Sequence, residues 1–426
     1  MSMVITFIEL MGLVVFASIL QKNFKIPSPI TLMTTVFGAM ALDLNLFKLD
    51  SEEFDTLVFL TLPLLIATDA LKLKWEDLKT HGFSLFWVAF VSVLLAIGIG
   101  VFINDYILVD YTLSIAAVVL LFCMVSATDP ITVSAIFANF KVPHKLKVLT
   151  EGESLFNDAT ALIVFSIALV ALNKPDEVNL QFIGMKSAMV VFGAIAIGLV
   201  LGYLTTLILH LSEDAFVEAT IIILSAYIAY FVSEHYHFSG ILAIIVDVVI
   251  ANKVIQKILK NEKEEIKKGS SKLLYKMTSK SNQSTIVNSI DFVAMFASAS
   301  LFVSIAAIVD IDSLIHYKYE IVAIFLATTL IRALMMMKFA FVSNSTKHMH
   351  YIQKHWWAVL TFSGSKGALS ILMVHMLPNT FEYKSLFETI IIGNILLSTF
   401  IYAFILALII IKNKVKFEQE CKEEVH

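Results

Sequence analysis

The chain has 426 residues, of which 58% are hydrophobic and 15% are charged, and its mean hydropathy is +0.84. Soluble globular domains contain about 25% charged residues, so this composition argues against a soluble protein. The net charge of −4 gives no support to nucleic-acid binding, and the sequence has neither a Gly-rich phosphate loop nor a His/Cys metal cluster that would indicate an enzyme. The composition therefore predicts an all-α, polytopic membrane protein.

Thirteen apolar segments approach the roughly 20 residues that a membrane-spanning helix needs. The first segment carries Glu9 but has no basic flank and no small-residue cleavage pattern, so we expect a retained helix and not a signal peptide. The thirteen expected spans are residues 3–21, 28–43, 55–71, 84–103, 112–136, 156–172, 186–209, 215–234, 238–251, 288–309, 319–341, 356–376 and 387–412.

Basic residues concentrate on one side of these spans. If the N-terminus lies outside, 24 Lys or Arg residues fall at cytoplasmic ends and five at outer ends. Short cytoplasmic loops of membrane proteins collect Lys and Arg. We therefore expect the N-terminus outside and the C-terminus in the cytoplasm, with the chain in a cell membrane of the prokaryotic inner-membrane type.

The longest polar interruption, residues 252–287, contains nine Lys. We expect a flexible cytoplasmic linker between two halves of a transporter, with a regulatory or lipid-headgroup-binding segment as the alternative. The transmembrane unit is then expected to comprise residues 1–251 and 288–412, and residues 413–426 would form a short cytoplasmic tail.

Two expected spans contain helix-breaking sequences. Pro130 follows Thr128 and Asp129 within the fifth span, and its ring removes a backbone donor, so the Ser126 carbonyl loses its usual helical partner. The sequence Gly-Ser-Lys-Gly at residues 364–367 is a weak point at the corresponding place in the second half. Paired interrupted helices are typical of secondary transporters built from inverted repeats, while a simple proline kink is the alternative.

Asp158 lies in the apolar run of the sixth span, where an ionisable side chain costs about 2.5–3.5 kcal/mol even on the lowest scales and usually marks an ion or proton pathway. Ser154 lies four residues earlier and shares its helix face. Carboxylate and hydroxyl oxygens are hard ligands that suit a small cation. These two residues therefore predict an ion site.

Glu153 and Asn157 share the neighbouring face of the same helix. Two basic residues fall inside other expected spans, Arg332 and Lys366, and Arg332 is the sole arginine of the chain. We expect Glu153 to neutralise one of these buried cations in a structural ion pair, or otherwise to lie at the cytoplasmic interface.

The sequences Ala-Thr-Asp-Pro at residues 127–130 and Glu-Gly-Glu-Ser-Leu-Phe-Asn-Asp at residues 151–158 together resemble the signature of the cation:proton antiporter-1 family of sodium/proton antiporters. The order of the spans, Arg332 and residues 364–370 fit the same resemblance. It implies exchange of Na⁺ or Li⁺ for H⁺ without a cofactor and without enzymatic activity. It also implies a homodimer in the lipid membrane, with a separate interface domain and a core domain in which two broken helices cross at the midplane.

The resemblance implies that Asp158 alternately binds cation and proton, with Thr128 and Asp129 in or near the coordination sphere. The expected Na⁺ ligands are Asp158, Ser154 and Thr128. Asn157 occupies the position of a second Asp in electrogenic relatives, which implies electroneutral exchange of one proton per cation. A K⁺/H⁺ antiporter of the same fold is the alternative, because selectivity depends on cavity geometry. A cation channel or a membrane scaffold is the alternative from a different class.

Three positions depart from the family pattern. Asp69 either replaces a family Glu in the third helix, as part of the cation site, or is an ordinary residue at the cytoplasmic end. Lys366 stands where the family has an arginine, and it keeps the charge without the planar fork of donors. Asp247 stands where the family prefers a small residue, with a position near the cytoplasmic mouth as the alternative reading.

Overall fold

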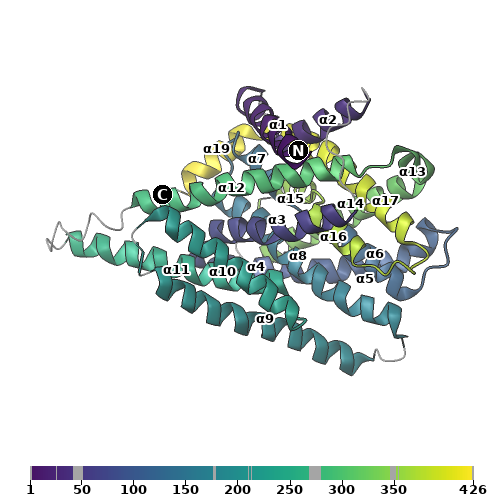
Figure 1. The fold of residues 1–426 in the computed structure, drawn as a ribbon, viewed down its shortest axis with the longest axis horizontal. Coiled ribbons are helices and arrows are strands. Elements are labelled where there is room, and N and C mark those ends of the chain that lie inside the picture. Colours follow the sequence, from purple (N-terminus) through teal and green to yellow (C-terminus); the bar gives the residue numbers. More distant parts are fainter. Residues whose placement is uncertain are drawn as a thin grey trace. The chain divides into compact units, whose positions relative to one another are not determined.

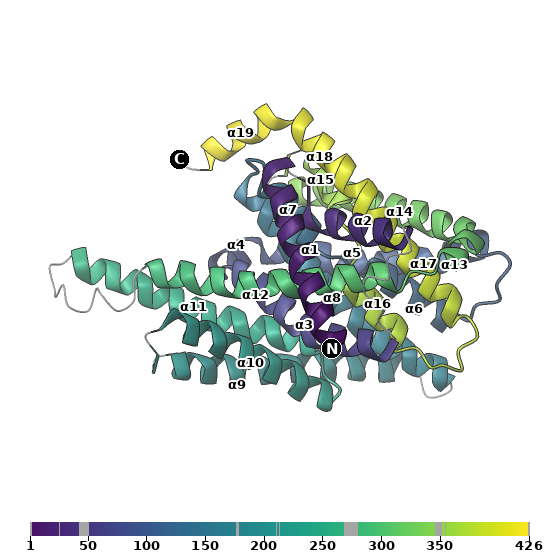
Figure 2. The same ribbon diagram turned by 45° about the horizontal axis from the view of Figure 1, so that its top comes forward.

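The computed structural model describes residues 2–24, 26–41, 51–175, 179–209, 211–212, 214–267, 280–345, 352–353 and 355–424. All regular elements in these ranges are helices, and none of the described residues forms a strand (Figure 1; Figure 2). The all-α prediction is therefore confirmed.

In chain order the elements, of which η1 and η4 are single π-helical turns, are α1 (Ser2–Phe24), α2 (Ser28–Ala41), α3 (Ser51–Lys72), α4 (Trp75–Phe86), η1 (Trp87–Val91), α5 (Ser92–Ile107), α6 (Ile115–Ser126), α7 (Ile131–Phe137), α8 (His144–Asn173), α9 (Leu180–Leu209), α10 (Ala215–His235), α11 (Gly240–Lys267), α12 (Lys280–Ala307), α13 (Ile311–His316), α14 (Lys318–Ser345), α15 (Trp356–Phe362), α16 (Ala368–His375), α17 (Lys384–Leu397), η4 (Ser398–Tyr402), α18 (Ala403–Lys412) and α19 (Lys414–Glu423).

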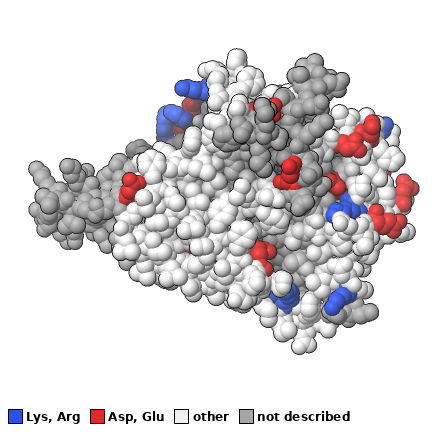
Figure 3. Space-filling view, viewed as in Figure 1, with Lys and Arg blue, Asp and Glu red and all other residues white. Residues whose placement is uncertain are grey.

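Within the described residues, eight helical stretches are long and apolar enough to cross a membrane: Trp75–Ile107, Ile115–Phe137, His144–Asn173, Gln181–Leu209, Ala215–His235, Thr285–Ala307, Lys318–Asn344 and Lys384–Lys412. Large apolar side chains such as Phe102 (78% exposed) and Phe192 (69% exposed) face outward, as lipid contact requires. The face drawn in Figure 3 is mostly uncharged. A multi-pass membrane protein is thus confirmed, while the count of thirteen spans stays a prediction.

One expected span falls short because it is broken: residues 356–376 form α15 and α16, of seven and eight residues. Another, residues 238–251, is only the apolar first part of α11, which continues to Lys267. The continuation is a run of good helix formers without Gly or Pro. The described ends of the expected linker are therefore helical, and residues 268–279 lie outside the described residues.

The chain divides into two compact units. The first contains Met1–Val58, His81–Ile183 and Ser298–His426, and the second contains Phe59–Thr80 and Gly184–Ala297. Both interrupted helices and α8, which carries Asp158, belong to the first unit. The division into a core and an interface domain stays a prediction.

The two interrupted helices of the first unit meet at their breaks. α6 ends at Ser126 with an extended Ala127, and α7 begins after Pro130. The backbone N–H of Asp129 donates to the carbonyl of Ser365 at 2.7 Å, in the break between α15 and α16. Irregular backbone at membrane depth is tolerated where protein covers it, and each break provides a partner for the other.

The C-terminal helix α19 packs on the first unit through Phe417, which is fully buried. Glu420 Oε2 accepts a hydrogen bond from the indole N–H of Trp356 at 3.0 Å, at the start of α15. Glu424 accepts hydrogen bonds from the backbone N–H groups of His144 (2.8 Å) and Lys145 (3.3 Å), where an anion is favoured by the first turn of α8. One short helix therefore holds the beginnings of α8 and α15.

We expect the docking of α19 to weaken as the pH rises, because burial raises the pKa of Glu420. The stability linked to such a carboxyl group is fully present below its unfolded pKa of about 4.3 and is lost as the pH rises through the folded value. Hydrogen–deuterium exchange of the α19 amides between about pH 4 and about pH 7 measures this, and Glu420→Gln should reduce the pH dependence, although Glu424 and His355, which lies 3.2 Å from Glu420, also titrate in this range. The exposed Glu423→Gln variant is the control, and identical pH profiles for Glu420→Gln and wild type would contradict the expectation.

Candidate cation site

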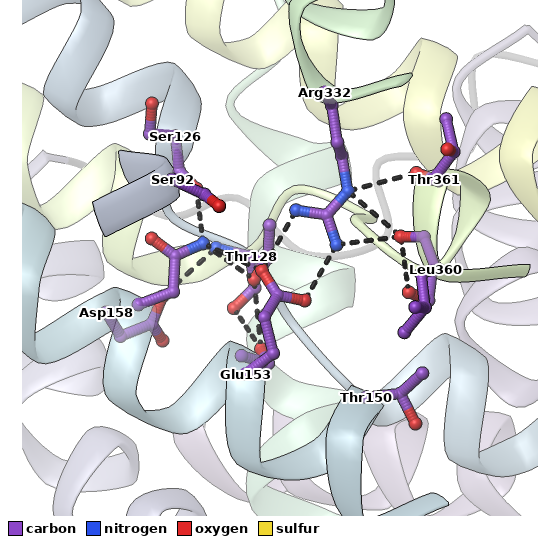
Figure 4. A network of polar contacts seen from close by, with 12 residues as sticks. Ser92, Ser126, Thr128, Thr150, Glu153, Asp158, Arg332, Leu360 and Thr361 are labelled. Atoms are coloured by element: carbon purple, nitrogen blue, oxygen red, sulfur yellow. Dashed lines mark hydrogen bonds and ion pairs between the residues drawn. The ribbon is translucent and has the colours of Figure 1, made fainter. Parts of the chain in front are cut away.

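Asp158 and Ser154 of α8 contact the break between α6 and α7. The backbone N–H of Thr128 donates to Asp158 Oδ1 at 3.0 Å, and the Thr128 hydroxyl donates to Ser154 Oγ at 3.2 Å. The Ser154 hydroxyl donates in turn to the Thr128 carbonyl at 2.7 Å. Thr128 and Ser154 are buried and Asp158 is half-buried. Figure 4 shows Asp158 on α8 beside Thr128.

Asn157 provides a hydrogen-bond donor for the Ser126 carbonyl, which has lost its helical partner because Pro130 has no N–H. Its side-chain N–H₂ donates to the Ser126 carbonyl at 2.8 Å and contacts Thr128 Oγ1 at 3.2 Å and Glu153 Oε1 at 3.4 Å. An unsatisfied buried carbonyl costs about 1–3 kcal/mol, so this amide stabilises the break. The Asn157 side-chain oxygen is buried without a hydrogen-bond partner among the described residues.

Glu153 and Arg332 form a bidentate ion pair between α8 and α14. Arg332 Nη1 lies 2.9 Å from Glu153 Oε1, and Nη2 lies 2.7 Å from Oε2, with side chains that are 10% and 2% exposed (Figure 4). The guanidinium also donates to the carbonyls of Leu360 (3.0 and 3.2 Å) and Thr361 (3.0 Å), which have no helical partner at the end of α15. Arg332 therefore connects α14, α8 and α15.

Glycine is needed in the break beside this arginine. A Cβ atom on Gly364 would lie 2.2 Å from Arg332 Nε, and one on Gly367 would lie 2.5 Å from Asp129 Cβ. No larger residue fits at either position without moving its neighbour. The two glycines of the Gly-Ser-Lys-Gly sequence thus allow the close contact between the breaks.

Lys366 is 4% exposed, and its backbone N–H donates to Ser398 Oγ in η4 at 2.9 Å. Together with Glu153, Asn157 and Arg332 it lines a cavity of about 40 Å³. A space of this size is large enough for an ordered water molecule. The cavity lies on the Glu153–Asn157 face of α8, and neither Asp158 nor Ser154 lines it.

The other two predicted acids have different surroundings. Asp129 Oδ1 accepts a hydrogen bond from the backbone N–H of Ile131 at 2.9 Å, at the start of α7. Asp69 belongs to the second unit, where its carboxylate pairs with Lys72 at 2.9 Å. The structure thus brings together Thr128, Ser154 and Asp158 with Asp129 in the same break, and the role of Asp69 in cation binding stays a prediction.

Four groups that bond to Arg332 or to the backbone of the two breaks were not predicted from the sequence. They are the carbonyls of Leu360, Thr361 and Ser365 and the hydroxyl of Ser398. Backbone carbonyls carry no residue-type signal, and Ser398 lies in an otherwise apolar stretch. The glycines of the second break were the single sequence signal available.

The groups gathered around Asp158 are carboxylate, hydroxyl and carbonyl oxygens, which suit a hard monovalent cation or a proton. Across the described parts of the chain, no group of three or more His, Cys, Asp or Glu residues is placed to hold a metal ion. The site is therefore suited to reversible ion binding with oxygen ligands.

The chain is similar in sequence to known antiporters. The Na(+)/H(+) antiporter NhaH of Halobacillus dabanensis is 33% identical over 239 residues, which cover 53% of this chain and 58% of the relative. The Na(+)/H(+) antiporter ApNhaP of Aphanothece halophytica is 25% identical over 375 residues, or 86% of this chain and 66% of the relative. The matches thus span between half and two thirds of these curated relatives.

The fold is similar to that of a solved structure, the sodium proton antiporter MjNhaP1 from Methanocaldococcus jannaschii. The TM-score is 0.75 at 18% sequence identity, with 97% of this chain and 99% of the other covered. The family model described as sodium/hydrogen exchanger, transmembrane, matches residues 10–412. This protein belongs to the transmembrane sodium/hydrogen exchanger family.

Proposed function

We propose that this protein is a secondary antiporter that exchanges Na⁺ or Li⁺ for H⁺ across the membrane. The observation that carries the proposal is the position of Asp158, a half-buried carboxylate whose Oδ1 lies 3.0 Å from the Thr128 amide in an interrupted helix. The names of the relatives and of the structural neighbour, all of them sodium/proton antiporters, support the same substrates.

The proposed cation ligands are Asp158, Ser154 and Thr128. The Ser154 and Thr128 hydroxyls now bond to each other and to the Thr128 carbonyl, and rotation about their C–O bonds turns oxygen lone pairs toward an ion. A bare carboxylate in this environment is costly, and either a cation or a proton neutralises it. Because Asp158 holds one at a time, binding of one species requires release of the other.

One-for-one exchange follows if Asp158 is the single carboxylate whose charge changes. The Glu153 charge is neutralised by Arg332, and Asp129 is engaged at the start of α7. Asn157 is neutral and donates to the broken helix. We therefore propose electroneutral exchange of one proton per cation.

Further features belong to the same proposal. The distribution of basic residues supports an N-terminus outside and a C-terminus in the cytoplasm, and the proposed location is a prokaryotic inner membrane. Alternating access would move a core domain with the two broken helices against an interface domain, in a homodimer. The helical residues next to 268–279 and the tail helix α19 would then lie in the cytoplasm.

The proposal is tested by reconstituting the protein into vesicles with a pre-formed pH gradient and a clamped membrane potential. We expect Na⁺ and Li⁺ to dissipate the gradient with saturable kinetics. A response to K⁺ alone would select the K⁺/H⁺ antiporter of the same fold, and a conductance without proton coupling would indicate a channel. No response to any of the three cations would contradict antiport.

Electroneutrality is tested in the same vesicles by setting the membrane potential to different values. We expect the initial exchange rate to be independent of the potential, because the net charge moved per cycle is zero. Each unit charge moved across the membrane would couple to about 2.3 kcal/mol per 100 mV. A clear dependence of the rate on the potential would contradict one-for-one exchange.

A further inference from the structure

The second unit contains a buried carboxylate that the exchange mechanism does not use. Asp247 of α11 is 1% exposed. Its Oδ1 lies 3.2 Å from Thr205 Oγ1 on α9, and its Oδ2 lies 2.7 Å from Ser225 Oγ on α10. The two hydroxyl oxygens also contact each other directly. The three side chains therefore form a closed ring of contacts between three helices.

Close backbone packing holds this ring in place. A Cβ atom on Gly198 of α9 would lie 2.6 Å from the Ala243 carbonyl oxygen of α11, and one on Gly202 would lie 3.0 Å from the Asp247 carbonyl oxygen. Glycines four residues apart allow helices to approach closely within a membrane. Thr205 lies one turn beyond Gly202, so this approach sets the distance between its hydroxyl and the Asp247 carboxylate.

The number of protons in the ring determines the charge of Asp247. Each of the three contacts needs one proton. The two hydroxyl groups supply two, an ionised carboxylate supplies none, and a protonated carboxyl group supplies one. A protonated Asp247 would supply the third. Its carboxyl group would then donate to Thr205, the Thr205 hydroxyl would donate to Ser225, and the Ser225 hydroxyl would donate back to Asp247.

No other group in the described part of the chain provides the missing charge or proton. The Asp247 carboxylate has no ion pair there, and its hydrogen bonds are to the two hydroxyls. The ring oxygens touch one another, which leaves no space for a metal cation between them. Helices α3, α9 and α10 of the second unit also carry titratable or charged side chains, and among the described residues none of these bonds to the Asp247 carboxylate. They include Asp69, Lys72, Tyr203, Glu218, Tyr227, Tyr230 and Glu234.

We propose that Asp247 is a second proton-binding site, separate from the cation site, that holds α9, α10 and α11 together while it is protonated. Raising the pH removes the third proton. Two protons then remain for the three contacts among Thr205, Ser225 and Asp247, so one pair of oxygens lies in contact without a hydrogen bond. The negative charge of the Asp247 carboxylate also stays buried. Deprotonation would therefore loosen the packing of these helices, so the second unit responds to pH independently of exchange at Asp158.

The Asp247→Asn variant tests this proposal, because asparagine reproduces the protonated form: its amide donates to Thr205 and its oxygen accepts from Ser225. The thermal unfolding midpoint of the full chain is measured between about pH 5 and about pH 9 for wild type, Asp247→Asn and the exposed Asp312→Asn. We expect Asp247→Asn to gain several degrees over wild type at high pH and little at low pH, with Asp312→Asn following wild type. A constant offset at all pH values would overturn the proposal.

Infrared spectroscopy provides a second readout on wild-type folded protein. A protonated carboxyl group gives a C=O band that an ionised carboxylate lacks. We expect this band at about pH 5 in wild type and its loss at about pH 9, its absence in Asp247→Asn at both, and a shifted frequency in Thr205→Val, which keeps the carboxyl group but removes its acceptor. A band of the same frequency in wild type and Thr205→Val, or no band at all, would overturn the assignment even if Asp247→Asn failed to fold.

Discussion

Asp158→Asn is expected to abolish cation-driven proton exchange, so that its exchange rate equals the background rate of protein-free vesicles. Asparagine has the same size and keeps an oxygen for the Thr128 N–H, now 3.0 Å from Asp158 Oδ1, so the local fold should be retained. It carries no negative charge, so it neither attracts a cation nor releases a proton. Both half-reactions of the exchange are lost together. Dissipation of a pH gradient by Na⁺ in proteoliposomes measures the effect.

The matched control is Asp312→Asn, the same chemical change at an exposed position near the start of α13. It should exchange at the wild-type rate. Size-exclusion profiles and unfolding midpoints of the two variants show whether Asp158→Asn is folded. Proton-coupled exchange that persists in folded Asp158→Asn would contradict the assignment of the carrier.

Arg332→Ala is expected to lower the free energy of unfolding by about 3–5 kcal/mol, because it leaves the Glu153 carboxylate buried without its partner. It also removes the donors to the Leu360 and Thr361 carbonyls at the end of α15. Glu153→Ala should have a comparable effect, since it leaves the guanidinium unpaired. Thermal or denaturant unfolding of the purified protein measures both variants.

The two changes should not be additive. The double variant Glu153→Ala/Arg332→Ala is expected to lose less stability than the sum of the losses in the two single variants. With both side chains removed, no buried charge is left without its partner. Arg332→Lys should be intermediate, because lysine keeps the charge but lacks the planar fork. Lys338→Ala, at an exposed position of the same helix, is the control. Arg332→Ala no more destabilising than Lys338→Ala would contradict the role of the pair.

Local sequence rules predicted the parts of the site that depend on near neighbours. The break after Ser126 follows from the missing N–H of Pro130 and is present between α6 and α7. The two faces of α8 follow from helical periodicity: Ser154 and Asp158 contact Thr128 in the break, while Glu153 and Asn157 contact each other and line the cavity.

Contacts between residues far apart in the chain were not predicted from the sequence. The choice between Arg332 and Lys366 as partner of Glu153 depends on how α14 and α15 pack, and composition does not determine it. Asn157 meets the Ser126 carbonyl across 31 residues of chain.

The tail helix shows a further limit. The expected polar tail gave no sign that Glu420 and Glu424 would contact Trp356 and the first turn of α8. These contacts depend on two surfaces that are 60 residues or more apart in sequence. Charge patterns predict that such a segment is exposed, but they do not identify its partner.

The most direct test of the account is the number of protons released when purified protein binds Na⁺. Calorimetric titrations in buffers of different ionisation enthalpy give this number without vesicles. Competition at Asp158 predicts one proton released per Na⁺ bound in wild type at a pH where the empty site is protonated, and no Na⁺-linked release in Asp158→Asn. Sodium binding without proton release, or release that is unchanged in Asp158→Asn, would contradict the claim that one carboxylate carries both ions.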